Sequence, residues 1–356
     1  MMTMRRVLLL AAAPAFLALA YLVSAIAEDA RFPSPQSAKA KQFHRNVSYG
    51  SHARQRLDLW IANSDKPSPL VLFFHGGDFR GGDKSQIPPG LLDEALSGGL
   101  SVASANYRLV GDGAAFPDFM KDGGRAIQFL RTKAKDFNLD PTRIAAAGDS
   151  GGGGIALWLA FHDDLADPKS EDPVLKESTR LSCAGGFRAQ TTYDPLFASE
   201  RIGANPELAG LILSGFFGPK WKGVRAPESK PLYAEASPVT YLTADDPPVF
   251  LAYDGPRDKL PRNAPLPDAV HHYGFGTILK ERMDPLKIEC VLVHLQDISR
   301  GGPLFKDVFI PADRRMAQFF KRQFERKTEK TPEKPAGPGT APAERESGPD
   351  PAGEKP

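Results

Sequence analysis

A serine lies between glycines where a buried strand is expected to give way to a helix. The sequence there is Gly148-Asp149-Ser150-Gly151-Gly152, after an apolar run at residues 144–147 and before a helix predicted over residues 155–161. Glycines without Cβ atoms let a strand and a helix approach closely around such a bend. The bend would hold Ser150 at positive φ with an exposed, nucleophilic hydroxyl, and the N–H of Gly151 would face a developing oxyanion.

The remaining pattern predicts the sheet that would hold this bend. Strands alternate with helices, which favours a mostly parallel sheet of about eight strands with helices on both faces. A Gly-, Pro- and aromatic-rich segment, residues 191–231, is expected to form a small irregular cap over the carboxyl edge of the sheet. Strands are expected at residues 43–49, 55–61, 69–74, 100–105, 144–147, 181–189, 249–253 and 288–295, and further helices at 116–135, 273–283 and 313–326.

The bulk composition argues against several kinds of partner. The 356 residues include 45 basic and 43 acidic side chains, a net charge of +2 that gives no reason to expect nucleic acid. Cys183 and Cys290 lie in apolar, strand-like runs and are expected to be buried thiols rather than a disulfide. No cluster of Cys and His has zinc-ligand spacing, so we expect no metal and no cofactor.

Both ends of the chain are predicted to lie outside the folded domain. Residues 1–27 combine two arginines, a long apolar run and the small-residue pattern Ala25-Ile26-Ala27, which predicts a secretory signal peptide. An uncleaved membrane anchor is the alternative, because the run approaches the roughly 20 residues that span a bilayer. Either interpretation predicts a secreted, periplasmic or cell-envelope protein. The expected divisions are a linker at residues 28–41, a folded domain at 42–326 and a disordered Pro/Glu/Lys-rich tail at 327–356.

Three motifs in this order resemble the α/β-hydrolase superfamily, and in particular the hormone-sensitive-lipase-like and BD-FAE-like esterases. Those proteins carry a His-Gly-Gly loop after one strand, Asn/Asp-Tyr-Arg-Leu after the next, and a Gly-Asp-Ser-x-Gly bend. This sequence has His75-Gly76-Gly77, Asn106-Tyr107-Arg108-Leu109 and Gly148-Asp149-Ser150-Gly151-Gly152. The resemblance covers roughly residues 46–325 and implies an α/β-hydrolase fold.

The resemblance also implies ester hydrolysis with an oxyanion hole. The tetrahedral oxyanion would lie between the backbone N–H groups of Gly76, Gly77 and Gly151. His75 is expected to brace this loop rather than to act as a base. Asp78 stands where relatives often have a further glycine, and its carboxylate would oppose the oxyanion if it pointed into the site.

The catalytic acid is less regular. Relatives place an aspartate a few residues after the seventh strand, just before a Val-Pro pair. Here Asp258 is the first candidate because Leu260-Pro261 follows it, although the spacing is one residue short. Asp254 is the alternative acid, and solvated loop aspartates without a catalytic role remain the other interpretation.

The catalytic histidine departs most from the pattern. Relatives carry Gly-His-x-Phe in the loop after the last strand, and residues 295–302 contain no histidine. His294, on the strand itself, is the first candidate. His271 and His272, which open the helix after the acid loop, are the alternatives. Each also has a structural interpretation, as a hydrogen-bonded strand histidine or a surface or capping residue.

Two functions follow from these features. The first is a secreted serine carboxylesterase that hydrolyses carboxylic esters through an acyl-enzyme on Ser150, with Asp258 and His294 as its acid and base. Its substrates would be small esters, with carbohydrate-linked esters among the candidates, and it would have no membrane partner unless the N-terminal segment were retained. The second is a catalytically degenerate α/β-hydrolase that serves as a binding or envelope scaffold, since the usual terminal-loop histidine is missing.

Overall fold

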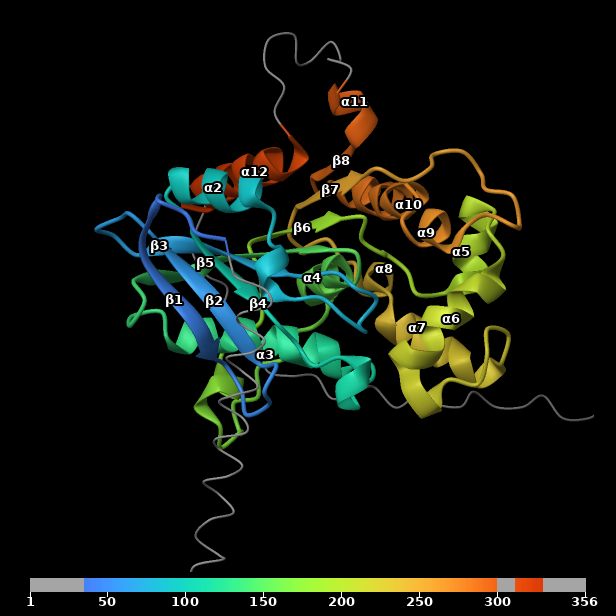
Figure 1. Ribbon diagram of the computed structural model, residues 1–356, viewed down its shortest axis with the longest axis horizontal. Coiled ribbons are helices and arrows are strands. Elements are labelled where there is room, and N and C mark those ends of the chain that lie inside the picture. Colours follow the sequence, from blue (N-terminus) through green and yellow to red (C-terminus); the bar gives the residue numbers. More distant parts are fainter. Residues whose placement is uncertain (1–34, 300–310, 329–356) are drawn as a thin grey trace, which may run out of the picture.

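An eight-stranded sheet with helices on both faces forms the body of the protein, in the order β1-β2-β4-β3-β5-β6-β7-β8 (Figure 1). The computed structural model describes residues 35–299 and 311–328, so the predicted signal peptide and most of the predicted tail lie outside the described residues. Strands β1 and β2 pair antiparallel, β2 pairs antiparallel with β4, and all other neighbours are parallel. The expected α/β-hydrolase architecture is confirmed.

The strands occur close to where the apolar runs predicted them. Their carboxyl ends line up through the register of the parallel pairs: Phe74 is opposite Gly148, Asp149 is opposite Phe187, and Tyr253 is opposite His294. The residues that follow these strands therefore share one edge of the sheet. The bounds are β1 Ala40–Ser48, β2 Arg56–Ala62, β3 Ser68–Phe74, β4 Ser101–Ala105, β5 Leu139–Asp149, β6 Cys183–Phe187, β7 Val249–Tyr253 and β8 Cys290–His294.

Alternation along the central strands creates two hydrophobic cores. On β3, Leu70, Leu72 and Phe74 face one core, while Val71 and Phe73 face the other. The first core packs against helices α3 (Asp118–Thr132), α4 (Gly151–Phe161) and α10 (Gly274–Met283). The second packs against α2 (Pro89–Ser97), a helix that the sequence pattern did not predict, and α12 (Ala312–Thr328), which lie side by side in Figure 1.

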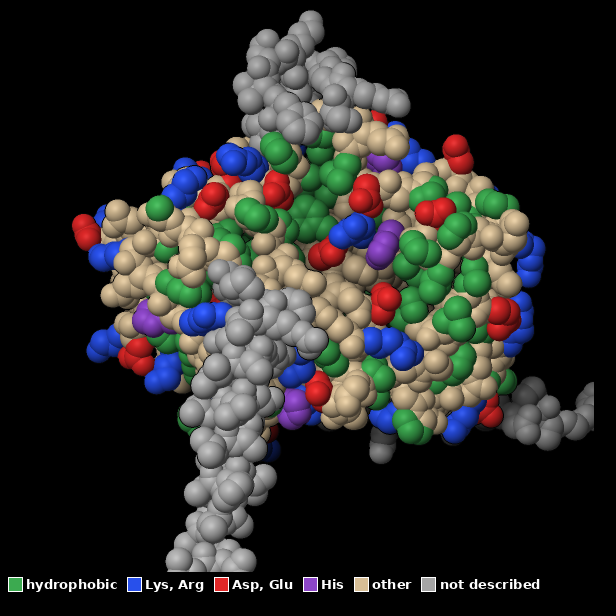
Figure 2. Space-filling model, in the orientation of Figure 1, with side chains coloured by type: hydrophobic (Ala, Val, Ile, Leu, Met, Phe, Trp, Pro, Cys, Tyr) green, Lys and Arg blue, Asp and Glu red, His purple; other side chains and the backbone are tan. Residues whose placement is uncertain are grey.

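The segment expected to form an irregular cap contains the helices α5 and α6, and α7 begins at its end. Asp194 and Asn205 cap the first two through their side chains, each with proline at the next position, and Gly203 and Gly218 end them. These local signals let a Gly- and Pro-rich sequence fold as short helices. Hydrophobic side chains gather on the surface over this part of the molecule (Figure 2). The helices are α5 Pro195–Ile202, α6 Pro206–Phe217 and α7 Lys230–Ala236, and the shorter ones elsewhere are α8 Pro238–Tyr241, α9 Leu266–Val270 and α11 Leu295–Ser299.

Two further features bear on earlier expectations. Cys183 and Cys290 are both buried thiols, as their apolar surroundings predicted. Among the described helices, none has the length and apolar character that a membrane crossing requires.

The bend between β5 and α4 depends on the absence of Cβ atoms. A Cβ on Gly148 would lie 2.2 Å from the carbonyl carbon and oxygen of Gly152, and one on Gly152 would lie 2.2 Å from the carbonyl oxygen of Phe74. Because both obstacles are backbone, neither can be relieved by a side-chain rotation. The strand and the helix can therefore approach this closely only with glycine at both positions.

We predict that Gly148→Ala lowers the free energy of unfolding by about 2–4 kcal/mol, since the new methyl group must push β5 away from α4. Gly111→Ala is the matched control, because a Cβ there would meet no atom within 4 Å. Thermal and denaturant unfolding of the two variants would check this. Equal stability of both variants would contradict the close packing of the bend.

Candidate active site

Ser150 occupies the apex of the bend with its hydroxyl next to a histidine. Its backbone has φ 49° and ψ −118°, the strained conformation expected of this position. Its Oγ lies 3.0 Å from Nε2 of His271, which is hydrogen-bonding distance for a nucleophile and its general base. The structure therefore brings the imidazole of His271 to the serine, in the position that a general base would take.

The structure does not bring His294, the first candidate from the sequence, to Ser150. His294 is buried at the end of β8, where its Nε2 lies 2.9 Å from the carbonyl oxygen of Gly255 and its Nδ1 accepts from the N–H of Gln296. Both ring nitrogens are thus engaged away from the serine. The structure thus places His271, and not the expected His294, beside Ser150, because contacts at the end of β8 hold the His294 ring away from the serine.

His272 also has a structural role. Its Nε2 lies 2.9 Å from the backbone carbonyl of Asp258, and its Nδ1 accepts from the N–H of Gly274 at 2.9 Å. These bonds tie the start of α10 to the loop after β7. Of the two adjacent histidines, only His271 is directed at the nucleophile.

Neighbouring backbone holds His271 in place. It caps the carboxyl end of α9, and Gln190 donates to the preceding carbonyl, that of Val270, at 2.6 Å. Gly255 packs directly beneath it, since a Cβ there would lie 2.2 Å from the His271 carbonyl oxygen. The imidazole therefore reaches Ser150 from the connection between β7 and β8, not from the loop after the last strand.

The two candidate acids both line an open polar pocket of ≈600 Å³ beside His271. Within the described residues, Nδ1 of His271 makes no hydrogen bond, so neither carboxylate holds the ring directly. Asp254 follows β7, forms an ion pair with Arg188 at 3.7 Å, and acts electrostatically on His271. Asp254 and Asp258 are both exposed, and Asp258 contacts the histidine pair through its backbone carbonyl. The geometry thus favours Asp254 over Asp258.

A partly exposed ion pair at the carboxyl edge of the sheet stands beside the nucleophile. Arg188, at φ 51° directly after β6, donates to Oδ1 of Asp149 at 2.9 and 3.0 Å and to Oδ2 at 2.8 Å. Asp149 precedes Ser150 and also borders Gly76, whose Cβ would lie 3.1 Å from Oδ2. This bidentate pair fixes the backbone on both sides of the serine. Acidic, basic and histidine side chains are seen next to one another near the middle of this face in Figure 2.

The pKa of His271 is lowered, mainly because burial disfavours the charged imidazolium. The guanidinium of Arg188 lowers the pKa further, whereas the carboxylates of Asp149, Asp78 and Asp254 oppose this effect. The ring is consequently neutral near pH 7 and able to accept the serine proton.

The expected oxyanion loop lies against the serine. A Cβ on Gly76 would come within 3.4 Å of the Ser150 Cβ, and Gly77 has φ 112°, which favours glycine. Within the described residues the N–H groups of Gly76, Gly77 and Gly151 have no hydrogen-bond partner. The structure therefore brings together the three amides that the sequence singled out.

His75 braces this loop, as expected. It is fully buried, stacks on Tyr107 with ring centroids 4.4 Å apart, and its Nδ1 lies 2.7 Å from the carbonyl oxygen of Gly76. Burial, the largest cause, lowers the pKa of His75 to about 4. A neutral, buried ring of this kind supports the loop and takes no part in proton transfer. Within residues 35–299 and 311–328, no group of His, Cys, Asp and Glu is placed to hold a metal ion.

Comparison with known proteins agrees with this fold. The BD-FAE family model matches residues 57–183, which include the glycine loop and the serine bend. A truncated carbohydrate esterase from gut microbiota superposes with a TM-score of 0.60 at 18% identity, over 82% of this chain and 99% of that one. A Thermogutta terrifontis esterase superposes with a TM-score of 0.52 at 20% identity, over 73% and 82% of the two chains. The chain therefore has the α/β-hydrolase fold, and its residues 57–183 are similar to the BD-FAE family.

Relatives of this α/β-hydrolase are named as ester hydrolases. A probable isoprenylcysteine alpha-carbonyl methylesterase of Arabidopsis thaliana (ICMEL1) is 28% identical over 269 residues, 74% of this chain and 54% of the relative. The probable carboxylic ester hydrolase LipM of Mycobacterium tuberculosis is 26% identical over 221 residues, 60% of this chain and 48% of the relative. The chain thus spans about half the length of the curated relatives it matches.

One weak signal in the sequence pointed to His271. His271-His272 follows the loop after β7 and directly precedes a helix, so the pair had to lie near the carboxyl edge. The sequence could not show that α9 turns one member of the pair toward Ser150. The orientation of His271 depends on contacts with Gln190, which is distant in the sequence, and with Gly255, which belongs to no motif shared with the histidine.

We predict that modification of Ser150 by a fluorophosphonate depends on a single group that ionises below the 6.5 of an unperturbed imidazole, because the lowered pKa of His271 keeps the base neutral in mild acid. The rate constant for labelling should rise with pH to a plateau, with a midpoint below 6.5. Asp254→Asn should move the midpoint to still lower pH, since that carboxylate raises the pKa. A midpoint at or above 7 would be incompatible with this site.

Proposed function

We propose that this α/β-hydrolase is a serine carboxylesterase that works through an acyl-enzyme on Ser150. The observation that carries the proposal is the 3.0 Å contact between Ser150 Oγ and His271 Nε2, at a bend where three backbone amides lack partners in the described residues. Nucleophile, base and oxyanion donors are the parts that acyl transfer requires. The ester hydrolases among the relatives support the same reaction class.

The first half-reaction transfers the acyl group to the enzyme. Ser150 Oγ attacks the ester carbonyl carbon while Nε2 of His271 takes its proton. The N–H groups of Gly76, Gly77 and Gly151 donate to the carbonyl oxygen as it becomes negative. Collapse of this intermediate breaks the bond to the alcohol oxygen, which receives the proton from His271 and leaves.

Water completes the cycle by the same path. His271 takes a proton from a water molecule that attacks the acyl-serine, and the acid product leaves as Ser150 regains its proton. Asp254 assists by favouring the imidazolium, since its negative charge raises the pKa of His271. We assign the electrostatic role to Asp254 rather than to Asp258.

The proposed substrates are small carboxylic esters, and carbohydrate-linked esters are included. The open polar pocket beside His271 could accept a hydrophilic alcohol such as a sugar, and one structural neighbour is named as a carbohydrate esterase. We further propose that the protein acts outside the cytoplasm, on the basis of the predicted signal peptide at residues 1–27.

A degenerate, binding-only hydrolase is the second candidate function. The observation that favours it is the Nδ1 of His271, which has no carboxylate partner within the described residues. A base that is not held in one tautomer abstracts the serine proton less efficiently. Turnover is therefore the measurement that separates the two candidates.

We predict that His271→Gln lowers kcat/KM for p-nitrophenyl acetate by about 10³-fold or more, because Ser150 loses its base. His294→Gln is the matched control. In His294→Gln the loss of kcat/KM should stay below about tenfold, because glutamine can still donate to the Gly255 carbonyl. Ser150→Ala should abolish both turnover and fluorophosphonate labelling. Absence of turnover and labelling in the unmodified protein would favour the binding-only function, and equal losses in the two histidine variants would remove His271 as the base.

A further inference from the structure

A small cavity of ≈70 Å³, lined by other residues than the polar pocket, opens beside the nucleophile. Gly151, the residue after Ser150, forms part of its wall, so a group bound there would belong to an ester positioned on Ser150. Most of the wall is apolar or aromatic and includes Phe79, Tyr193 and Phe275. The polar groups in this wall are therefore the features that would discriminate between substrates.

Asp78 brings a carboxylate to this wall. It lies in the oxyanion loop at φ 54°, and within the described residues it has neither an ion pair nor a hydrogen bond. The neighbouring Arg80 does not neutralise it, because its guanidinium donates to the carbonyl of Leu211 on α6. The charge of Asp78 reaches into the site, since it contributes to raising the pKa of both Tyr193 and His271.

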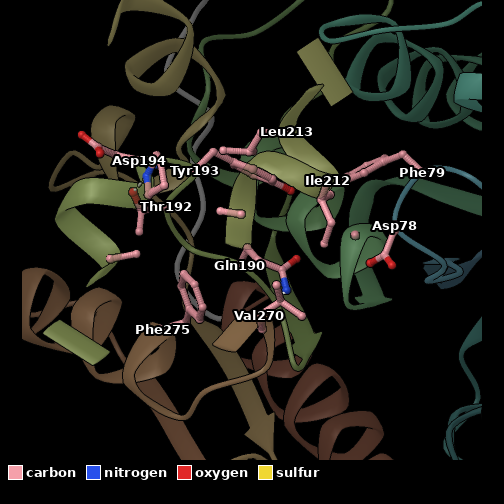
Figure 3. Close-up of a pocket in the computed structure, with 14 residues that line it drawn as sticks. Asp78, Phe79, Gln190, Thr192, Tyr193, Asp194, Ile212, Leu213, Val270 and Phe275 are labelled. Atoms are coloured by element: carbon pink, nitrogen blue, oxygen red, sulfur yellow. Dashed lines mark hydrogen bonds between the residues drawn. The ribbon is translucent and has the colours of Figure 1, made fainter. Parts of the chain in front are cut away.

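Gln190 adds a second acceptor. Its Nε2 donates to the backbone carbonyls of Arg188 at 3.2 Å and Val270 at 2.6 Å, and these bonds fix the orientation of the amide. The Oε1 atom is left without a partner in the described residues. Figure 3 shows this oxygen on the side of the cavity where Asp78 lies.

The other polar side chains in the wall do not offset these acceptors. No Lys, Arg or His lines the cavity. The hydroxyl of Thr192 lies against that of Ser237 at 3.2 Å, and the hydroxyl of Tyr193 is buried against Gly154. Asp194 turns its carboxylate away to cap α5. The wall thus combines the carboxylate of Asp78, the amide oxygen of Gln190 and the unpartnered hydroxyl of Tyr193, and it holds no cation.

We propose that this cavity binds a small ammonium group carried by the ester substrate, held between the carboxylate of Asp78 and the amide oxygen of Gln190. An ammonium supplies the positive charge that the wall lacks and N–H donors for the two acceptors, and the aromatic rings beside it favour a cation further. This inference rests on the proposed esterase function, and it specifies a substrate class: esters with a protonated amine a few atoms from the carbonyl.

The same carboxylate should act against uncharged esters. A negative charge in the oxyanion loop opposes the negative charge that develops on the carbonyl oxygen. A bound ammonium would compensate that repulsion, so charged substrates gain both in binding and in the transition state. Without Asp78, an otherwise apolar cavity would prefer a hydrocarbon group over a hydrated cation.

The test compares two pairs of esters of equal shape, in which a protonated nitrogen replaces a CH group. Dimethylaminoethyl acetate against isopentyl acetate places the charge in the alcohol. Methyl dimethylaminopropanoate against methyl isohexanoate places it in the acyl group. For the unmodified protein, we expect kcat/KM to favour the charged member in one pair.

Asp78→Asn is the decisive variant, because asparagine tolerates positive φ as well as aspartate does and keeps the shape of the side chain. We expect it to lower the charged-to-neutral ratio of kcat/KM about tenfold and to raise kcat/KM for the neutral ester. If Asp78 had a purely structural role, the variant would lower kcat/KM for the charged ester and for the neutral ester together. Asp194→Asn is the matched control: it removes a nearby negative charge that points away, and should change the ratio less than about twofold.

Binding separates failure of this proposal from failure of the esterase function. Ser150→Ala protein should bind the charged ester about tenfold more tightly than its neutral counterpart in calorimetry, and Ser150→Ala/Asp78→Asn should lose the difference. Charge-dependent binding without turnover by the unmodified protein would keep the ammonium site and overturn the esterase. Turnover with a ratio that Asp78→Asn leaves unchanged in both ester pairs would overturn the ammonium site alone.

Discussion

The close approach of β5 and α4 is the constraint on which the site depends. Gly148 and Gly152 meet at a distance that excludes any Cβ, and this contact forces Ser150 into its strained conformation at the edge of the sheet. The parallel register of β3 and β5 then sets Gly76 against the serine. Nucleophile and oxyanion amides are thus positioned by backbone packing alone, which is more rigid than any arrangement of side chains.

The charged residues around that rigid centre differ between the open polar pocket and the small cavity. On the side of the open pocket, Arg188 is held by Asp149 and keeps the pKa of His271 low. On the side of the small cavity, the carboxylate of Asp78 carries charge that no described residue balances. A substrate would therefore meet a neutral His271 on one side and the negative charge of Asp78 on the other. In the proposed complex, a positive charge on the substrate balances that of Asp78.

Much of the fold followed from local pattern. Apolar runs such as residues 69–74 and 249–253 located the central strands, and the glycine-flanked Ser150 located the bend, because burial and backbone strain restrict residue type within a few positions. The helices of the cap were harder to foresee. Their caps at Asp194 and Asn205 are local, but the Gly- and Pro-rich composition around them is also typical of irregular chain.

The sequence by itself determined the nucleophile, the oxyanion amides and the architecture that holds them, since each depends on the absence of side chains or on a periodic apolar pattern. Only the tertiary structure decided that His271, and not His294, serves Ser150, and that Asp254 lies in the better position than Asp258 to act on it. The physical reason is that a short helix, α9, and contacts from Gln190 and Gly255 aim the imidazole. The orientation of this side chain depends on packing between segments that are distant in the sequence, and the spacing of residues along the chain does not reveal it.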